Sequence, residues 1–435
     1  MKAVPAWLAR HGVRRVHGHP FPGSNGSDVD MALAALLAEA DGTVGPGVGA
    51  TWDGEVLTLL SRQVVVPSGD PLPAGSIGDF DDIVADALTH GAGSVAVRIG
   101  FGVRAAKSRA AKTGAGVRRA DPSLAARFRG RDVAAGERLD VDILLAGAGV
   151  VRTGMVDELA KLAQKSRLGV LNTFTAKGMF GWDSPYHLGT AFLQERDLEL
   201  AGIGPHTRLL MMGIDADECP PALLDRAGVW IGPDASVWSV PATELPELAS
   251  RVASAHGRPP EPGELYRVLA SIVQPMYDRA SLPFTPPRAA VELLRSLPAD
   301  GAITVEPGLA GMWVARAIPT TRLGSVRVPA AGRPGSAVAA ALNLALDGRP
   351  ALAIIDAPAS AASLELMELA RSRDLSFVVA EWGQHGHHRT ADDYANAVSA
   401  AFSQGGVHLI RTPVDLTLTT LLTDAAGPLV AWSGP

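Results

Sequence analysis

The stretch from residue 350 to residue 386, PALAIIDAPASAASLELMELARSRDLSFVVAEWGQHG, opens the part of this chain whose residue types and spacing best fit a chemical site. Asp356 follows one apolar run and Glu381 follows the next. Three of the chain's eleven histidines, His385, His387 and His388, come directly after Glu381. Carboxylates suit a hard cation such as Mg²⁺, and histidine titrates near neutrality. The pattern therefore predicts metal binding or proton transfer.

Two strands and the helix between them must position these groups. The apolar runs Ala351–Ile355 and Ser376–Ala380 predict buried strands, and Ser363–Arg371 predicts a helix. Ligands of parallel α/β sheets bind at the carboxyl ends of strands, where Asp356 and Glu381 stand. Two plainer interpretations stay open. Asp356 would be a helix cap in an ordinary turn, and the histidines would lie in an exposed polar loop.

The composition limits the function classes. With 435 residues and 47% apolar content, the chain can form two to four domains with buried cores. A net charge of −6 gives no reason to expect nucleic acid as a partner. The one cysteine, Cys219, excludes an intrachain disulfide and fits a reducing, cytoplasmic setting. No apolar run reaches the ~18 residues of a membrane span.

Strands that alternate with helices predict an α/β protein of three domains, each with a mainly parallel sheet flanked by helices. We expect a first domain at 1–103, a basic linker at 104–138 and a central domain at 139–258. A linker with helices follows at 259–300, and a third domain at 301–435. The basic part, Arg104–Arg131, holds nine Lys or Arg and one acid. A solvated linker is the first interpretation, and an arm touching a phosphorylated ligand is the second.

A glycine turn in the central segment also has two interpretations. Gly147-Ala148-Gly149 follows an apolar strand as in a dinucleotide-binding turn, but Arg152 stands where a third glycine belongs. A tight strand-to-helix turn explains this pattern better. Arg152 and Lys177 remain candidates to meet an anionic ligand at a helix N-terminus.

The whole chain resembles the acetolactate synthase and benzoylformate decarboxylase branch of the thiamine-diphosphate (ThDP)-dependent enzymes. The central stretch DILLAGAGVVRTGMVDELAKLAQKSRLGVLNTFTAKGMFGWDSPYHLGT carries the best match, with Thr175–Phe180 where that family has a Gly-Lys-Gly-type loop. Gly12–Pro20 resembles the family's opening segment, and Arg327–Ala340 resembles the turn and helix before its diphosphate site. Ile355-Asp356-Ala357 stands where the family has Gly-Asp-Gly, and Glu381-Trp382 where it has Asn-Asn. The first domain resembles a truncated pyrimidine-binding domain.

The resemblance implies a set of site residues. In that family Mg²⁺ bridges the cofactor's diphosphate, and the two positions that hold it correspond to Asp356 and Glu381. The cofactor-binding candidates are Asp356, Ser360, Gly332 and Arg333. The catalytic candidates are Glu381, Gln384, His385 and Glu55.

Two departures from the family pattern affect these expectations. Ile355 and Ala357 replace the glycines that let the backbone approach phosphate, and Pro358 has no N–H to donate. The family's activating glutamate has Glu55 as its nearest counterpart here. The neighbouring Asp53-Gly54 is a hairpin-turn signal, so a surface hairpin glutamate is the alternative interpretation.

Two functions follow from these observations. In the first, the chain is a divergent ThDP-enzyme homologue that has lost ThDP–Mg²⁺ catalysis. It would then act as a cofactor-free enzyme or as a binding or partner subunit. In the second, it is a ThDP-dependent lyase or carboligase acting on a 2-oxo acid. Whether it is an enzyme stays open. The resemblance implies a homodimer or homotetramer with a small-molecule ligand.

Overall fold

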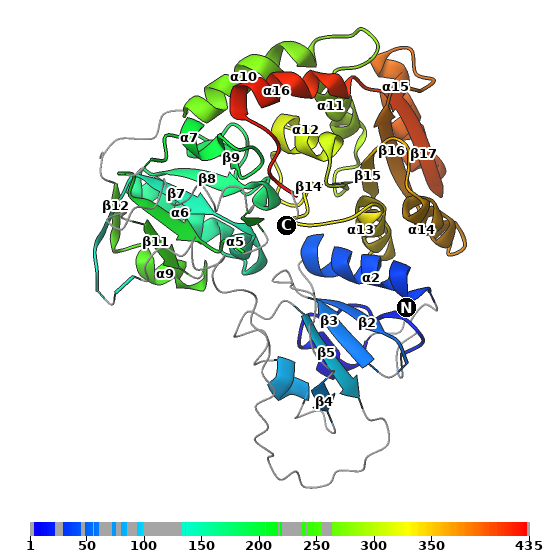
Figure 1. Ribbon diagram of the computed structural model, residues 1–435, viewed down its shortest axis with the longest axis horizontal. Coiled ribbons are helices and arrows are strands. Elements are labelled where there is room, and N and C mark those ends of the chain that lie inside the picture. The colour runs from blue at the N-terminus through cyan, green and yellow to red at the C-terminus, as the bar shows by residue number, and fades with distance from the viewer. Residues whose placement is uncertain are drawn as a thin grey trace. The chain divides into compact units, whose positions relative to one another are not determined.

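The computed structural model describes residues 4–21, 29–44, 48–54, 56–60, 72–74, 80–84, 94–99, 133–134, 136–204, 206–215, 218–219, 237–240, 242–254 and 263–432. The chain divides into two compact units, Met1–Pro122 and Ser123–Pro435, which are described separately (Figure 1). The basic stretch Arg104–Arg131 and residue Glu55 lie outside the described residues. The finer division into five segments therefore stays a prediction.

The first unit contains a five-stranded sheet in the order β1-β2-β3-β5-β4. Its described elements are α1 (Ala6–Ala9), β1 (His17–Gly18), α2 (Met31–Glu39), η1 (Ala40–Val44), β2 (Gly49–Trp52), β3 (Val56–Leu60), β4 (Leu72–Ala74) and β5 (Ser94–Ile99). The helix α2 begins after Asp30, whose side chain accepts a 2.8 Å hydrogen bond from the backbone N–H of Ala32. Ser94–Ile99 forms β5, which lies between β3 and β4 in this sheet.

The first sheet is mixed and differs from the mainly parallel sheet that we expected. β1 pairs with β2 and β4 with β5 in parallel, but β3 runs antiparallel to both of its neighbours. The turn at Asp53-Gly54 is the physical reason. Gly54 has φ +108°, and the Asp53 carboxylate accepts a 2.7 Å hydrogen bond from the Val56 N–H, so the chain folds back as a hairpin.

The second unit begins with a parallel five-stranded sheet in the order β11-β10-β7-β8-β9. Beside it, β6 and β12 form a two-stranded parallel sheet. The elements are β6 (Leu139–Val141), β7 (Ile143–Ala146), α5 (Ala148–Arg152), α6 (Val156–Ser166), β8 (Gly169–Thr173), η2 (Phe174–Ala176), β9 (His187–Ala191), α7 (Asp197–Leu200), β10 (Leu209–Met212), β11 (Val237–Val240), η4 (Ala242–Glu244), α9 (Leu245–Leu248) and β12 (Val252–Ser254).

The other sheet of the second unit is also wholly parallel, in the order β14-β13-β15-β16-β17. Its elements are α10 (Glu264–Tyr277), α11 (Pro286–Ser296), β13 (Ala302–Val305), α12 (Leu309–Ala317), β14 (Val326–Arg327), α13 (Ser336–Leu346), β15 (Ala351–Asp356), α14 (Ala361–Arg371), β16 (Phe377–Gly383), α15 (Ala391–Gln404), β17 (Val407–Pro413), η5 (Leu416–Leu418) and α16 (Thr419–Ala426). The α/β architecture predicted from the sequence is confirmed.

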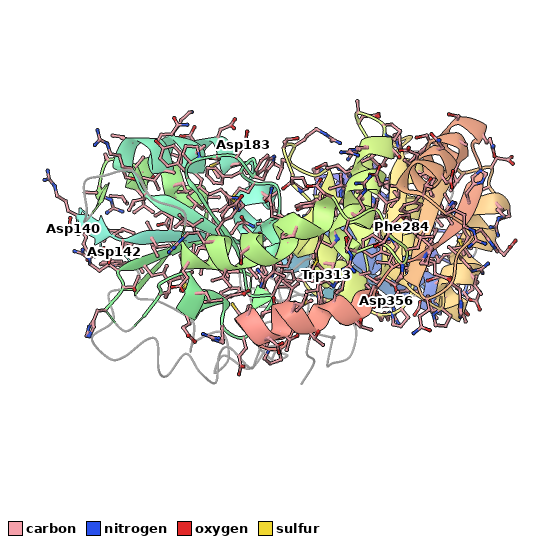
Figure 2. All side chains as sticks on the ribbon, turned by 90° about the horizontal axis from the view of Figure 1, so that it is seen from above. Asp140, Asp142, Asp183, Phe284, Trp313 and Asp356 are labelled. Atoms are coloured by element: carbon pink, nitrogen blue, oxygen red, sulfur yellow. The ribbon has the colours of Figure 1, made fainter. Side chains whose placement is uncertain are left out.

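The two parallel sheets share one apolar core. Leu171 of β8 and Ile354 of β15 belong to the same cluster of buried side chains, together with Trp313 of α12. Figure 2 shows Trp313 and Asp356 in the part of the unit that is built around the sheet β14-β13-β15-β16-β17. Within the described residues, no helix is both long and apolar enough to span a membrane.

Candidate functional site

The strand order of the last sheet points to one place for a ligand. In chain order, β13 is its first strand and β14 its second, so β14-β13-β15-β16-β17 is a doubly wound 2-1-3-4-5 arrangement. In such sheets the connections leave the two central strands toward opposite faces, which opens a crevice at the carboxyl ends. Here those strands are β13 and β15. Glu306 directly follows β13, and Asp356 is the last residue of β15.

The Asp356 carboxylate caps the N-terminus of α12. Its carboxylate accepts hydrogen bonds from the backbone N–H groups of Leu309, at 3.0 Å, and Ala310, at 2.8 Å. A Cβ at Gly308 would collide with the Asp356 carboxylate, so the glycine permits this approach. Burial raises the pKa of Asp356, and the two N–H donors oppose that rise. The N-terminus of α12, which could otherwise bind an anionic ligand, is already occupied by the Asp356 carboxylate.

Glu306 is the strongest proton-transfer group at this edge, and the sequence analysis missed it. Burial and the nearby Asp356 carboxylate raise its pKa to about 7, although hydrogen bonds from the backbone of α13 and from Ser363 oppose the rise. Gly335 N–H, just before α13, donates to Glu306 Oε1 at 2.5 Å. A carboxyl group that titrates near neutrality can both give and take a proton under ordinary conditions. The signal that was available is the break Val305-Glu306-Pro307-Gly308 after a buried strand.

Ser336 adds an unsatisfied hydroxyl at the N-terminus of α13. Its Oγ is buried and makes no hydrogen bond within the described part of the chain. The predicted cofactor-binding residue Gly332 packs next to it, because a Cβ built on Gly332 would lie 2.8 Å from Ser336 Oγ. Arg333, predicted with Gly332, lies exposed in the same loop. A ligand at this helix end would meet Ser336 Oγ and Glu306 together.

Ser360 has a structural role in this state of the protein. Its hydroxyl caps α14 by accepting a 3.1 Å hydrogen bond from the Ser363 N–H. An N-cap hydroxyl is a common way to satisfy the first N–H groups of a helix.

Glu381 lies on the other face of the sheet from Asp356. The register pairs Glu381 with Ile355, whereas Asp356 pairs with Trp382, and successive residues of a strand point to opposite faces. The Glu381 carboxylate is buried and accepts from the Ala359 N–H at 3.1 Å and from Arg411 Nε at 3.2 Å. The structure therefore does not bring together the two carboxylates that we predicted as metal ligands.

The remaining predicted residues of this region lie at the surface. Gln384 and His385 are exposed in the loop between β16 and α15. His388 is partly buried, and its ring lies 5.5 Å from that of Tyr394. Burial lowers the pKa of His388. Gln384 and His385 make no contact with Glu306 or Asp356 among the hydrogen bonds of the described residues.

These residues do not fit ThDP with Mg²⁺ in the way the resemblance implies. The Asp356 carboxylate occupies the N-terminus of α12, and the Glu381 side chain projects from the opposite face of the sheet. The side chain of Ala357 stands against Gly383, where a Cβ on that glycine would be 2.5 Å from Ala357 Cβ. Within the described residues, no three His, Cys, Asp or Glu side chains are grouped to hold a metal ion.

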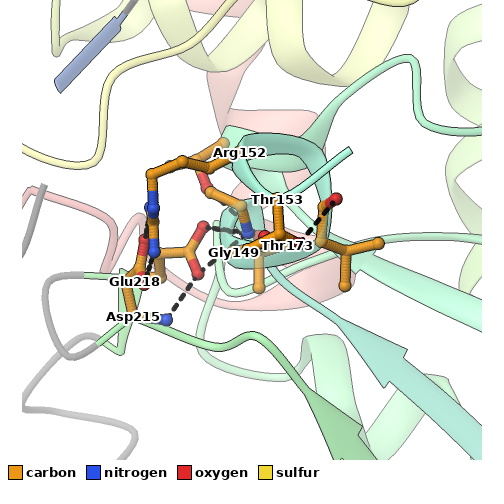
Figure 3. A network of polar contacts seen from close by, with 9 residues as sticks. Gly149, Arg152, Thr153, Thr173, Asp215 and Glu218 are labelled. Carbon is orange, nitrogen blue, oxygen red and sulfur yellow. Dashed lines mark hydrogen bonds and ion pairs between the residues drawn. The ribbon is translucent and has the colours of Figure 1, made fainter. Parts of the chain in front are cut away.

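The glycine turn between β7 and α5 is also occupied by a carboxylate of the chain itself. Glu218 is fully buried, and its carboxylate accepts hydrogen bonds from Ala148 N–H at 2.9 Å, Asp215 N–H at 2.8 Å and Thr173 Oγ1 at 2.9 Å (Figure 3). Arg152 forms a bidentate ion pair with Asp215, at 2.6 and 2.7 Å. The turn is thus closed by the chain's own charges, and Arg152 is not free to meet an anion there.

Comparison with solved structures identifies the fold. Benzoylformate decarboxylase from Polynucleobacter necessarius is similar over 94% of this chain and 88% of its own, with a TM-score of 0.59 and 13% identity. The chain shares the fold of this decarboxylase. A protein of Mycobacterium smegmatis, provisionally described as a thiamin diphosphate-dependent enzyme, matches 63% of this chain at 16% identity and a TM-score of 0.47. This chain spans only 62% of that protein's length.

The other two comparisons gave no match. No protein-family model matches the sequence, and no curated protein does. At these identities the likeness extends to the fold, and function has to be argued from the site.

Proposed function

We propose that this chain is an enzyme that uses its own carboxyl groups for acid–base chemistry on the scaffold of ThDP-dependent enzymes, without ThDP and Mg²⁺. Glu306 is the proton-transfer group. Ser336 Oγ and the N-terminus of α13 hold the substrate beside it. Asp356 keeps α12 in place and helps to keep Glu306 protonated near neutral pH.

One observation carries the proposal: Asp356 occupies the anion position of α12, while Glu306 beside it titrates near neutrality. A diphosphate at α12 would have to displace the partly buried Asp356 carboxylate from two N–H donors. A carboxyl group with a pKa of about 7, in contrast, is poised for general acid–base catalysis.

The reaction class that suits these groups is proton abstraction next to a carbonyl. A single general base commonly contributes about 10²- to 10⁴-fold to such a step. The Ser336 hydroxyl can donate to the carbonyl oxygen as negative charge develops there. The decarboxylase of similar fold is named for benzoylformate, a 2-oxo acid, so 2-oxo acids are the first compounds to examine.

The first experiment is a calorimetric titration of the purified protein with ThDP in the presence of Mg²⁺. We expect no saturable heat. Saturable, Mg²⁺-dependent binding that disappears in Asp356→Ala would overturn the proposal and favour a ThDP-dependent lyase or carboligase.

The second experiment detects proton transfer without knowledge of the product. Small carbonyl compounds, including 2-oxo acids with α-protons, are incubated with protein in D₂O, and loss of their α-proton signals is followed by NMR. We expect Glu306→Gln to slow exchange by about 10²-fold or more. Glu365→Gln, on the exposed side of α14, is the matched control. A compound that binds but never exchanges would identify a binding protein instead of an enzyme.

The oligomeric state belongs to the same proposal. We infer a homodimer or homotetramer from the resemblance stated above, and light scattering coupled to size-exclusion chromatography measures it directly. A monomer at all concentrations would contradict the inferred homo-oligomer but would leave the proposed acid–base chemistry unaffected.

A further inference from the structure

Lys177 is a buried amine without a carboxylate partner. It follows η2, retains 9% of its surface, and forms no ion pair within the described residues. The charged group that acts on it is another cation, Arg316 of α12. Burial and this cation lower the pKa of Lys177 to about 7. A lysine that is desolvated and next to a second cation is an activated nucleophile.

Arg316 itself is fully engaged and therefore offers Lys177 only repulsion. Its guanidinium forms a buried ion pair with Asp197 at 2.5 Å and donates to the Thr190 carbonyl at 2.7 Å. The Asp197 carboxylate is in turn held by the N–H groups of Leu193 and Gln194, at 2.9 and 3.0 Å. No part of this acid is left to neutralise Lys177.

His187 supplies a second unsatisfied group within the electrostatic range of Lys177. Its Nε2 lies 2.9 Å from Asn172 Oδ1. The amide of Asn172 is oriented by its Nδ2, which donates to the Thr173 carbonyl at 2.8 Å. Nε2 therefore carries the proton, and Nδ1 keeps its lone pair.

The free lone pair of His187 has no hydrogen bond. Nδ1 is buried and has no partner within the described part of the chain. Burial and the charge of Lys177 lower the pKa of His187 to about 4, with the backbone of Gly189 opposing, so the ring is neutral at pH 7. A buried acceptor without a partner requires an explanation, and a role in catalysis is one of those that native proteins offer.

We propose that Lys177 forms an imine with a small aldehyde or 2-oxo acid, assisted by His187. The Lys177 amine attacks the carbonyl carbon, and the C–N bond forms as the carbonyl π electrons move to the oxygen. His187 Nδ1 carries the two amine protons, one after the other, from the nitrogen to that oxygen. The first gives a hydroxyl group, and the second lets it leave as water while the nitrogen lone pair forms the second C–N bond. The product is a C=N bond, with no net oxidation or reduction.

This site is separate from the edge that carries Glu306. Arg316 lies near the C-terminal end of α12, whereas Asp356 contacts the first two residues of that helix. Six or seven residues of helix correspond to about 10 Å. The imine proposal therefore does not depend on the proposed function.

The test is reductive trapping of the whole protein with glyoxylate or pyruvate and cyanoborohydride at pH 7, followed by peptide mapping. The chain has six lysines, so every possible adduct can be assigned. At pH 7 an amine of pKa about 7 has a free fraction about 10³-fold above that of an ordinary lysine. We expect Lys177 to be labelled at least tenfold faster than Lys161 or Lys165.

Three variants separate the possible outcomes. Lys177→Arg and Lys177→Met should both lose the adduct while their circular dichroism stays that of the wild type. His187→Gln should keep the fold and slow labelling, while the labelling rate still rises through pH 7 because that rise follows the loss of the proton from Lys177. Labelling that spreads over the exposed lysines, or that spares Lys177, would overturn the proposal.

Discussion

The carboxylate of Asp356 lies 2.8 Å from the backbone nitrogen of Ala310, 46 residues earlier in the chain. The same relationship recurs in the first parallel sheet, where Glu218 accepts from Ala148 N–H at 2.9 Å. In both sheets a carboxylate of the chain accepts hydrogen bonds from backbone N–H groups at a helix N-terminus, the kind of place where an anionic ligand binds. The chain has thus filled two anion positions of its scaffold with its own side chains.

Asp356→Ala should destabilise the second unit. The substitution leaves two N–H groups at the start of α12 without an acceptor, and we expect a loss of about 2 kcal/mol in the free energy of unfolding. Urea denaturation at pH 7 measures it. Asp424→Ala, at an exposed position of α16, is the control and should change stability little. An Asp356→Ala protein as stable as the wild type would show that the carboxylate is not held for structure.

Glu306 should make the protein less stable as the pH rises from 4.5 to 7. Its pKa is raised from 4.5 to about 7 on folding, so the folded state holds a proton that the unfolded state has already lost. The contribution is fully present below pH 4.5 and disappears as the pH passes 7. Its upper bound is about 3.5 kcal/mol, from 2.5 pH units at about 1.4 kcal/mol per unit.

Glu306→Gln should remove this slope while leaving the other titrations in place. The measurement is the difference in the free energy of unfolding between variant and wild type at pH 4.5, 6 and 8. A difference that does not change with pH would mean that folding does not raise the pKa of Glu306.

Lys177→Met should stabilise the protein at pH 7. The folded state disfavours the ammonium, whose pKa falls from 10.5 to about 7, so the wild type is penalised fully below pH 7. The penalty fades as the pH approaches 10.5, where the unfolded chain also loses its proton. We expect a gain of about 2 kcal/mol or more at pH 7 that shrinks toward pH 10. Thermal unfolding at the two pH values measures both; Lys161→Met at the surface should show neither effect.

The buried pair of Arg316 and Asp197 should behave as a coupled unit. Arg316→Met or Asp197→Leu alone leaves one buried charge uncompensated, and each should cost about 3–5 kcal/mol. The double variant should recover much of that loss, because neither charge is then buried without its partner. A double-mutant cycle by urea denaturation measures the coupling. Additive losses would show that the two residues act independently.

The sequence determined the elements and the class of fold. The strand Ala351–Ile355 and the helix Ser363–Arg371 were predicted within two residues of the bounds that the structure has. The strand Ser376–Ala380 was predicted within three residues of the observed β16. Apolar periodicity and capping residues are local properties, so a single segment carries enough information to specify them.

The metal site predicted from the sequence does not form, because the orientation, hydrogen bonds and pKa of a carboxyl group depend on residues far away in the chain. The stretch around Asp356 and Glu381 predicted one shared metal site, but strand register sends the two carboxylates to opposite faces. Their hydrogen-bond partners come from other elements. Glu306 and Lys177 became candidates through burial and neighbouring charge, which only the assembled core creates. The sequence alone thus determined where strands end, and the tertiary structure decided which side chains at those ends are left to act.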